Sequence, residues 1–167
     1  MNNLRLRRIH IAGPYGSGKS TFAKKLSKIL KIPIYELDEL KYNRKNNTER
    51  NEKEMNSILK KIVLKKSWII EGAWSDRARD SFRRADMVII LNPPHRTLIY
   101  NHLKRIISRQ KKFSLSFNIK LLRKSLNYSS MKKHPSFHSH FKEARKNKEY
   151  RVIKSKWEVK NFLNQFK

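Results

Sequence analysis

Hydrophobic positions along this chain form short apolar runs that are separated by longer stretches of helical spacing. The apolar runs predict strands, which lie at about residues 6–12, 32–37, 68–70, 86–91 and 151–154. The helical stretches carry an apolar residue every three or four positions, at about residues 22–30, 52–63, 77–84, 95–110, 117–126 and 157–166. Because strands and helices alternate, we expect an α/β fold with a mainly parallel sheet covered by helices on both faces.

Some segments carry a more local signal. Residues 41–50 are polar, basic and rich in asparagine, which predicts a loop. Thr48 is the expected N-cap of the helix at 52–63. The helix at 95–110 should present one apolar face, formed by Leu98, Ile99, Leu103, Ile106 and Ile107. Residues 111–149 have the weakest pattern, because they are basic and rich in serine and histidine.

The composition indicates one domain with an extreme positive charge. The chain has 167 residues, no cysteine and no apolar run near the ~20 residues of a membrane span, so we expect a cytoplasmic protein. Lysine and arginine number 41 against 13 acidic residues, which gives a net charge of +28. Such a surface attracts polyanions, but a general lysine and asparagine bias of the source proteome explains the charge equally well.

One stretch carries specific chemistry. Residues Gly13–Thr21, GPYGSGKST, fit the phosphate-binding pattern G-x-x-x-x-G-K-[ST]. The glycines let the backbone form a cup of inward N–H groups, and the helix that follows adds unpaired N–H groups. Lys19 supplies a charge for the β- and γ-phosphates, and the Ser20 hydroxyl can ligate Mg²⁺. Because a strand precedes the loop and a helix follows it, a nucleotide-phosphate site is favoured over a glycine-rich turn.

Polar residues also follow three other predicted strands: Asp38, Glu71-Gly72 and Asn92. Ligands of α/β sheets bind at the carboxyl ends of the strands, so these residues should share a crevice with the phosphate-binding loop. Asp38 and Glu71 are both candidates for a carboxylate near Mg²⁺. We assign Asp38 to the acceptor and Glu71 to the water shell of the metal, with a helix N-cap or a surface acid as the alternative for each.

Taken in order, these segments resemble the small P-loop kinases of the adenylate-kinase type, and more closely the bacterial DNA topology-modulation (FlaR-like) proteins. The resemblance covers about residues 8–109 and the terminal strand and helix. The matching segments are residues 13–21, 32–38 and 68–72, residues 85–91 with Pro93-Pro94, and Arg105-x-x-x-Arg109. It implies a three-layer P-loop NTPase fold in one domain, 1–167, with five parallel strands in the order 2-3-1-4-5 and a basic lid-like insertion at about 110–149. Asn92 and the turn at 71–77 depart from the adenylate-kinase pattern, so a nucleoside monophosphate acceptor is not implied.

The loop motif and the resemblance together give a set of site residues for ATP and Mg²⁺. The expected ATP-binding residues are Gly13, Tyr15, Gly16, Ser17, Gly18, Lys19, Ser20, Thr21, Arg109 and Lys156. The residues expected to act in catalysis are Lys19, Asp38, Arg105 and Arg109, and those expected near the metal are Ser20 and Glu71.

Arg105 and Arg109 lie four positions apart and share a helix face. This arrangement fits either binding of the transferred phosphoryl group or a solvated basic face. Ser155, Lys156 and Trp157 occupy the position that the resemblance gives to the adenine-contacting loop, although a tryptophan there is more often part of the core. Trp74 and Arg77 are candidates for the acceptor side.

These residues favour an ATP-dependent kinase that transfers the γ-phosphate to a nucleotide or another small-molecule acceptor, as a monomer or homodimer. The alternative is a nucleic-acid-binding protein with a nucleotide-binding loop. It is suggested by the basic segment with its interleaved aromatic residues Tyr128, Phe137, Phe141 and Tyr150. A nucleotide-gated partner binder without turnover is a third possibility.

The histidines of the same segment form no metal-binding pattern. His134, His138 and His140 lack nearby cysteines or a patterned acid. We interpret them as a solvated or nucleic-acid-facing stretch.

Overall fold

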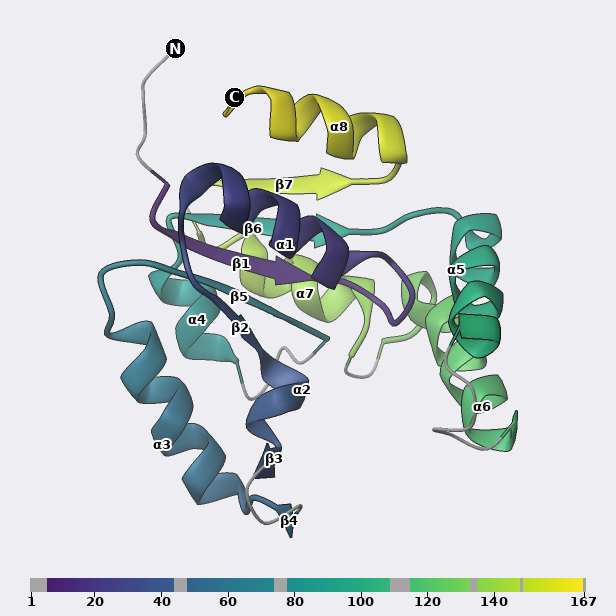
Figure 1. Cartoon of the computed structure of the whole chain (residues 1–167), viewed down its shortest axis with the longest axis horizontal. Coiled ribbons are helices and arrows are strands. Elements are labelled where there is room, and N and C mark those ends of the chain that lie inside the picture. The colour runs from purple at the N-terminus through teal and green to yellow at the C-terminus, as the bar shows by residue number, and fades with distance from the viewer. Residues whose placement is uncertain are drawn as a thin grey trace.

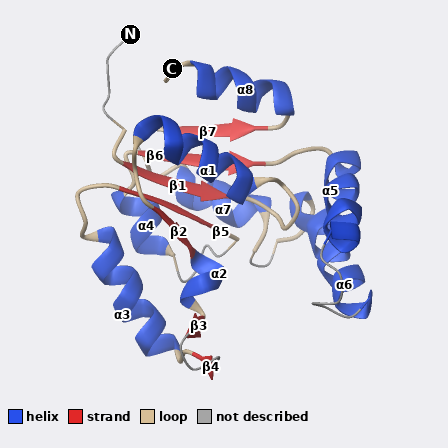
Figure 2. Cartoon of the chain, in the orientation of Figure 1, coloured by secondary structure: helices blue, strands red, loops and turns tan. Residues whose placement is uncertain are grey.

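The central element of the fold is a parallel sheet of five strands (Figures 1 and 2). The computed structural model describes residues 6–43, 48–73, 78–108, 115–132, 135–147 and 149–166. The sheet strands are β1 (Arg8–Ala12), β2 (Ile34–Glu36), β5 (Trp68–Gly72), β6 (Met87–Leu91) and β7 (Tyr150–Ile153). They lie in the order β2-β5-β1-β6-β7, and every neighbouring pair is parallel. Counted along the chain this is the order 2-3-1-4-5, so the predicted fold is confirmed.

Helices cover both faces of the sheet (Figure 1). One face carries α1 (Lys19–Leu30) and α8 (Lys156–Asn164), and the other carries α3 (Glu52–Val63), α4 (Arg79–Arg84) and α7 (Phe137–Ala144). The strands point toward α5 (His95–Ser108) and α6 (Leu115–Leu126), and η1 (Asn127–Ser129) follows α6. These two helices therefore lie at the carboxyl end of the sheet.

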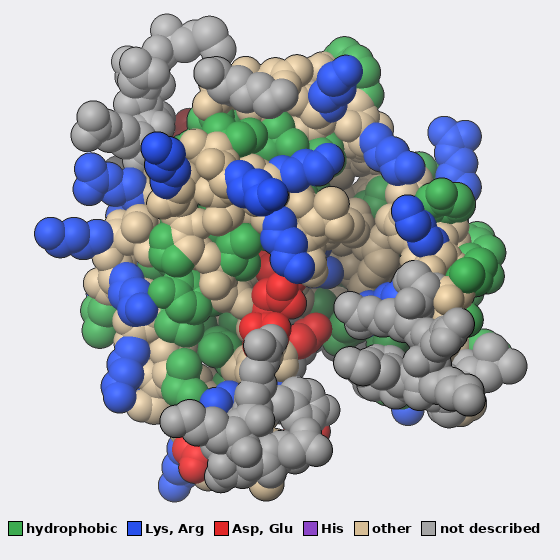
Figure 3. Space-filling model, viewed as in Figure 1, with side chains coloured by type: hydrophobic (Ala, Val, Ile, Leu, Met, Phe, Trp, Pro, Cys, Tyr) green, Lys and Arg blue, Asp and Glu red, His purple; other side chains and the backbone are tan. Residues whose placement is uncertain are grey.

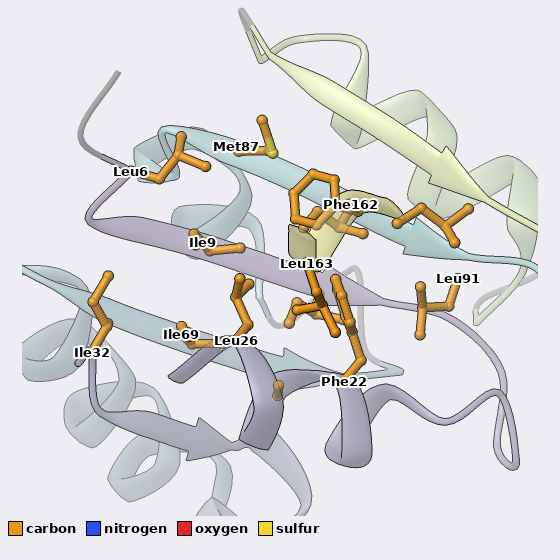
Figure 4. Close-up of a cluster of buried hydrophobic side chains, with 14 residues drawn as sticks. Leu6, Ile9, Phe22, Leu26, Ile32, Ile69, Met87, Leu91, Phe162 and Leu163 are labelled. Carbon is orange, nitrogen blue, oxygen red and sulfur yellow. The ribbon is translucent and has the colours of Figure 1, made fainter. Parts of the chain in front are cut away.

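Two hydrophobic layers hold the helices to the sheet, because alternate strand residues point to opposite faces. On the face of α1 and α8, a cluster contains Ile9, Ile11, Ile69, Ile89, Phe22, Leu26, Phe162 and Leu163 (Figure 4). On the opposite face, a second cluster contains Ile70, Val88, Ile90, Leu59, Ile62 and Phe82. Burial of both faces explains why the central strands read as nearly continuous apolar runs.

The segment after β2 differs from its prediction. The short helix α2 (Leu37–Leu40) follows β2, and the expected loop contains a hairpin of β3 (Tyr42–Asn43) and β4 (Thr48–Glu49). The N-cap prediction for Thr48 is wrong, because Thr48 pairs with Asn43 in this hairpin. Asn51 caps α3 instead, and its side chain accepts a hydrogen bond from the Glu54 N–H.

Helix α5 keeps little of its apolar face in the core. Leu98 is buried, but Ile99, Leu103, Ile106 and Ile107 are exposed. The reason is its position, since α5 packs at the end of the sheet against the loop after β1 and against α6. Of the helices in the described ranges, none is long and apolar enough to cross a membrane.

Helix α7 belongs to the core, so the prediction of a solvated histidine segment is wrong for His140. This histidine is fully buried; its Nε2 lies 2.9 Å from the Ala73 carbonyl oxygen, and its Nδ1 contacts the Tyr128 hydroxyl. His138 is exposed as expected, and His134 lies outside the described residues. The segment from 137 to 144 therefore forms part of the helical layer on the sheet.

The aromatic residues of this segment are also packed inward. Tyr128 is buried, and Phe137, Phe141 and Tyr150 pack against the second hydrophobic cluster and against one another. They therefore do not form the base-stacking surface that the nucleic-acid interpretation requires.

His10 is the polar residue of β1, and it is fully buried against Phe82. Its Nδ1 lies 2.9 Å from Ser81 Oγ, and the Ser81 hydroxyl donates to the Ala78 carbonyl. The ring Nδ1 must therefore carry the hydrogen, whereas Nε2 has no partner among the described groups. Burial, with a smaller contribution from the charge of His140, lowers the pKa of His10 to about 3.

Folding stability should therefore fall when the pH drops below 6.5, the ordinary pKa of His10. Between pH 6.5 and about 3 the unfolded chain binds a proton at His10 that the folded chain does not bind, so acid favours unfolding. We expect the free energy of unfolding to drop by up to about 1.4 kcal/mol per pH unit in this window. Urea unfolding across the window measures the slope. His10→Leu should flatten it, the exposed control His138→Ala should keep it, and an unchanged slope in His10→Leu would contradict the assignment.

Candidate functional site

The loop between β1 and α1 has the shape that its glycines predict. Gly16 and Gly18 have φ angles of 78° and 91°, in the region that side chains disfavour. A Cβ atom at Gly16 would lie 2.8 Å from His102 Cδ2, so the loop also packs too closely there for any side chain. A Cβ atom at Gly18 would meet nothing within 4 Å, which shows that open space adjoins the N-terminus of α1.

Lys19 is the first residue of α1 and is 8% exposed. Its Nζ donates a hydrogen bond of 2.9 Å to the Pro14 carbonyl and lies 5.8 Å from the centroid of the Tyr15 ring. Burial lowers the pKa of Lys19, while the charges of Glu71 and Asp38 act in the opposite direction. The charges of both predicted carboxylates therefore act on the lysine of the loop.

Ser20 and Glu71 are in direct contact, although they lie 51 positions apart in the sequence. The Ser20 hydroxyl donates to Glu71 Oε1 at 2.6 Å, and Glu71 is almost fully buried at the end of β5. The structure thus brings together the two residues that the sequence predicted near the metal.

Gly72 leaves room for the first residue of α2 at the end of β5. A Cβ atom at Gly72 would lie 2.7 Å from the Leu37 side chain, so the missing side chain leaves room for Leu37 to pack on the end of β5. Asp38 follows Leu37 in α2 and is exposed. Asp38 therefore lies in a helix that packs against β5, the strand that carries Glu71.

Acidic side chains gather on this side of the molecule in spite of its high positive charge. Figure 3 shows Asp and Glu side chains near the centre of one face, with Lys and Arg side chains spread around them. Burial raises the pKa of Glu36, and the charges of Glu71 and Glu39 raise it further. In the described part of the chain, no group of three or more His, Cys, Asp and Glu residues is arranged to hold a metal ion.

Helix α5 contributes two polar contacts to the loop that the sequence analysis missed. Asn101 Nδ2 donates to the Gly16 carbonyl at 2.7 Å. His102 Nε2 lies 3.2 Å from the Tyr15 carbonyl oxygen and also 3.2 Å from Ser125 Oγ of α6. One signal in the sequence could have found them: Asn101 and His102 lie three and four positions after Leu98, on the same side of the helix. The periodicity of apolar residues does not reveal them, because both are polar.

The remaining predicted residues lie around this centre or outside the described residues. Arg105 is partly buried, and its charge acts on Lys19. Lys156 is exposed, with its Nζ 5.4 Å from the centroid of the Tyr100 ring, so the start of α8 lies next to α5. Trp157 is 70% exposed and is not a core residue. Thr21 is exposed on α1.

Asn92, after β6, accepts a hydrogen bond from the Ser129 hydroxyl. Arg109, Trp74 and Arg77 lie outside the described residues.

Comparisons with known proteins identify the fold. The sequence matches no protein-family model, and no curated protein matches it. The structure is similar to shikimate kinase from Acinetobacter baumannii in complex with shikimate, with 15% identity, a TM-score of 0.64, and coverage of 96% of this chain and 90% of that chain. Shikimate kinase from Bacteroides thetaiotaomicron gives 17% identity, a TM-score of 0.60 and 96% coverage of both chains. A sugar kinase from Janibacter sp. gives 15% identity, a TM-score of 0.56, and coverage of 96% and 91%.

The chain thus has the P-loop NTPase fold that is found in shikimate kinase, and all three of these neighbours are kinases. At such low identities the likeness establishes the fold alone.

Proposed function

We propose that this protein is an ATP-dependent kinase that transfers the γ-phosphate to a hydroxyl group of a small molecule. The observation that carries the proposal is the convergence of a glycine loop, buried Lys19, the Ser20–Glu71 contact and Asp38 at one end of the sheet. Phosphoryl transfer requires mainly positioning and neutralisation of charge, and this arrangement offers both. The kinase fold of the structural neighbours supports the same class of reaction.

The residues present fit a polyphosphate with Mg²⁺. Ser17 Oγ is buried without a hydrogen-bond partner among the described groups, and space is open at Gly18. Loop N–H groups and Lys19 would bind the β- and γ-phosphates, while Ser20 and Glu71 supply the hard oxygen atoms that Mg²⁺ prefers. When bound, the ion would neutralise charge that develops on the phosphate oxygens.

On the acceptor side we assign Asp38 to orient the attacking hydroxyl and to take its proton. Asp38 is exposed in α2, which packs against β5, and its charge acts on Lys19. The acidic side chains of this region, Glu36, Asp38, Glu39 and Glu71, disfavour a strongly anionic acceptor and favour a neutral polyhydroxyl compound. We assign Arg105 and Arg109 to the transferred phosphoryl group, and Lys156 to the adenine side.

The finer resemblance to DNA topology-modulation (FlaR-like) proteins depends on sequence segments alone, and it is compatible with a small-molecule kinase. The nucleic-acid alternative was suggested by the aromatic residues between positions 128 and 150. These residues pack inward, so they do not support that alternative. A cytoplasmic kinase acting as a monomer or homodimer is the form in which we expect the protein.

An acceptor screen tests the proposed function. Purified protein with Mg²⁺ and ATP is incubated with sugars, polyols, nucleosides, nucleotides and small hydroxy acids, and release of ADP is followed. We expect release that depends on a hydroxyl compound and a phosphorylated product detectable by mass spectrometry. If the protein does not bind ATP in a direct titration, the proposed function is wrong.

Removal of the metal contacts should change the Mg²⁺ requirement. Ser20→Ala and Glu71→Gln are each expected to raise the half-saturating Mg²⁺ concentration about 10–100-fold, because both residues would orient ligands of the ion. Excess chelator should abolish turnover of the parent protein. Activity measured against Mg²⁺ concentration gives the value, and the exposed control Glu52→Gln should match the parent. Identical curves for Glu71→Gln and the parent would remove Glu71 from the metal site.

A further inference from the structure

The structure assigns a positioning role to two neighbouring residues of α5: Asn101 and His102 hold the phosphate-binding loop in its binding shape, and Ser125 of α6 holds His102. The part of this inference that concerns nucleotide binding rests on the proposed function. The contacts themselves are properties of the folded chain.

Asn101 and His102 form hydrogen bonds with the carbonyl groups of two consecutive loop residues. Asn101 donates to the Gly16 carbonyl at 2.7 Å, and His102 lies 3.2 Å from the Tyr15 carbonyl. In a planar trans peptide the C=O and N–H groups point in opposite directions. Drawing these carbonyls toward α5 therefore turns the N–H groups of Gly16 and Ser17 away from α5. The Ser17 N–H indeed stays within the loop, where it donates a hydrogen bond to the Pro14 carbonyl oxygen at an N···O distance of 3.2 Å.

The hydrogen bonds define the tautomer of His102. The Ser125 hydroxyl donates to the Leu121 carbonyl at 2.8 Å, so its oxygen is available to accept. The Tyr15 carbonyl can only accept, and both oxygens lie 3.2 Å from Nε2. Nε2 therefore carries a hydrogen that is shared between the loop and α6. Burial lowers the pKa of His102, which keeps the ring neutral near pH 7.

Close packing adds a second contact between His102 and the loop. His102 is 3% exposed, and its Cδ2 lies 2.8 Å from the position that a Cβ atom on Gly16 would occupy. Ser125 is 1% exposed, so the contact between the ring and α6 excludes water. The shape of the loop is thus coupled by direct contact to the position of α6.

Hydrogen exchange and nucleotide binding test this role together. Exchange of a peptide that covers residues 13–21 is measured by mass spectrometry without nucleotide, and the Kd for Mg²⁺-ADP is measured by calorimetry. In His102→Leu we expect loop exchange to become faster and the Kd to rise, each by about tenfold, which is the size of one lost hydrogen bond. His102→Gln, which retains a side-chain N–H donor, should recover most of both effects.

The matched control is Leu103→Ala, an exposed position on the same helix, which should behave like the parent. If His102→Leu does not fold, the partly buried Asn101→Ala tests the second contact with the same two measurements. Exchange and Kd within about twofold of the parent in these variants would overturn the inference. Equal effects in Leu103→Ala would also overturn it, because they would indicate general destabilisation of α5. Faster exchange in His102→Leu in a protein that binds no nucleotide would support loop positioning while refuting the proposed kinase.

Discussion

Replacing Lys19 with alanine is expected to lower kcat/KM for ATP by at least about 10²–10³-fold. Lys19 is a buried lysine at the N-terminus of α1, and the charges of Glu71 and Asp38 act on it. In the proposed reaction, charge that develops on the phosphoryl oxygens during transfer would lose the fixed cation that the loop motif supplies. Steady-state kinetics with the acceptor from the screen measures the loss.

Two variants make the Lys19 result specific. Lys19→Met keeps most of the side-chain volume without the charge, and it should be as inactive as Lys19→Ala. Lys25→Ala removes an exposed lysine from the same helix and should retain parent activity. Parent-like ATP turnover by a pure, folded Lys19→Ala protein would refute the proposed function.

Asp38→Asn is expected to lower kcat by about 10²–10⁴-fold with little change in the KM for ATP. An amide can still accept a hydrogen bond from the acceptor hydroxyl, but it cannot take the proton. Separate titrations of ATP and acceptor measure kcat and both KM values. The effect differs from that of Glu71→Gln, for which we expect a changed Mg²⁺ requirement, so the two carboxylates are distinguishable.

Asp80→Asn provides the control for Asp38, since it removes the same charge from an exposed position in the first turn of α4. It should retain parent kinetics. If Asp38→Asn keeps its kcat while Glu71→Gln loses it, the roles of the two carboxylates are exchanged.

The sheet was predictable because its information is local. The central strands are mainly apolar because both faces of the sheet are buried, and the glycine motif begins directly after β1. The hairpin of β3 and β4 was not predictable, because its strands are two residues long and carry no apolar alternation. Helix α7 was missed because His140 and Ser139 face inward there, satisfied by hydrogen bonds that a hydrophobic pattern cannot show.

The candidate site was partly predictable for a similar reason. Motif spacing and the rule for strand ends brought Lys19, Ser20, Asp38 and Glu71 to one place, and the Ser20–Glu71 contact agrees with that placement. Asn101 and His102 act through carbonyl groups of residues 85 or more positions away, so no local pattern marks them. The interpretation of Trp157 as a core residue is wrong, because Trp157 lies at the start of α8 and is 70% exposed.

The contact between Gly72 and Leu37 has a consequence for the spacing of Asp38 and Glu71. The distance between Asp38 and Glu71 depends on how closely α2 packs on the end of β5. This close packing requires glycine at position 72, because a Cβ atom there would lie 2.7 Å from the Leu37 side chain. A single methyl group at this position would tilt the turn and widen the gap while leaving both acids unchanged. In the proposed kinase, the spacing of these two carboxylates would therefore be adjustable through Gly72, a residue that carries no functional group.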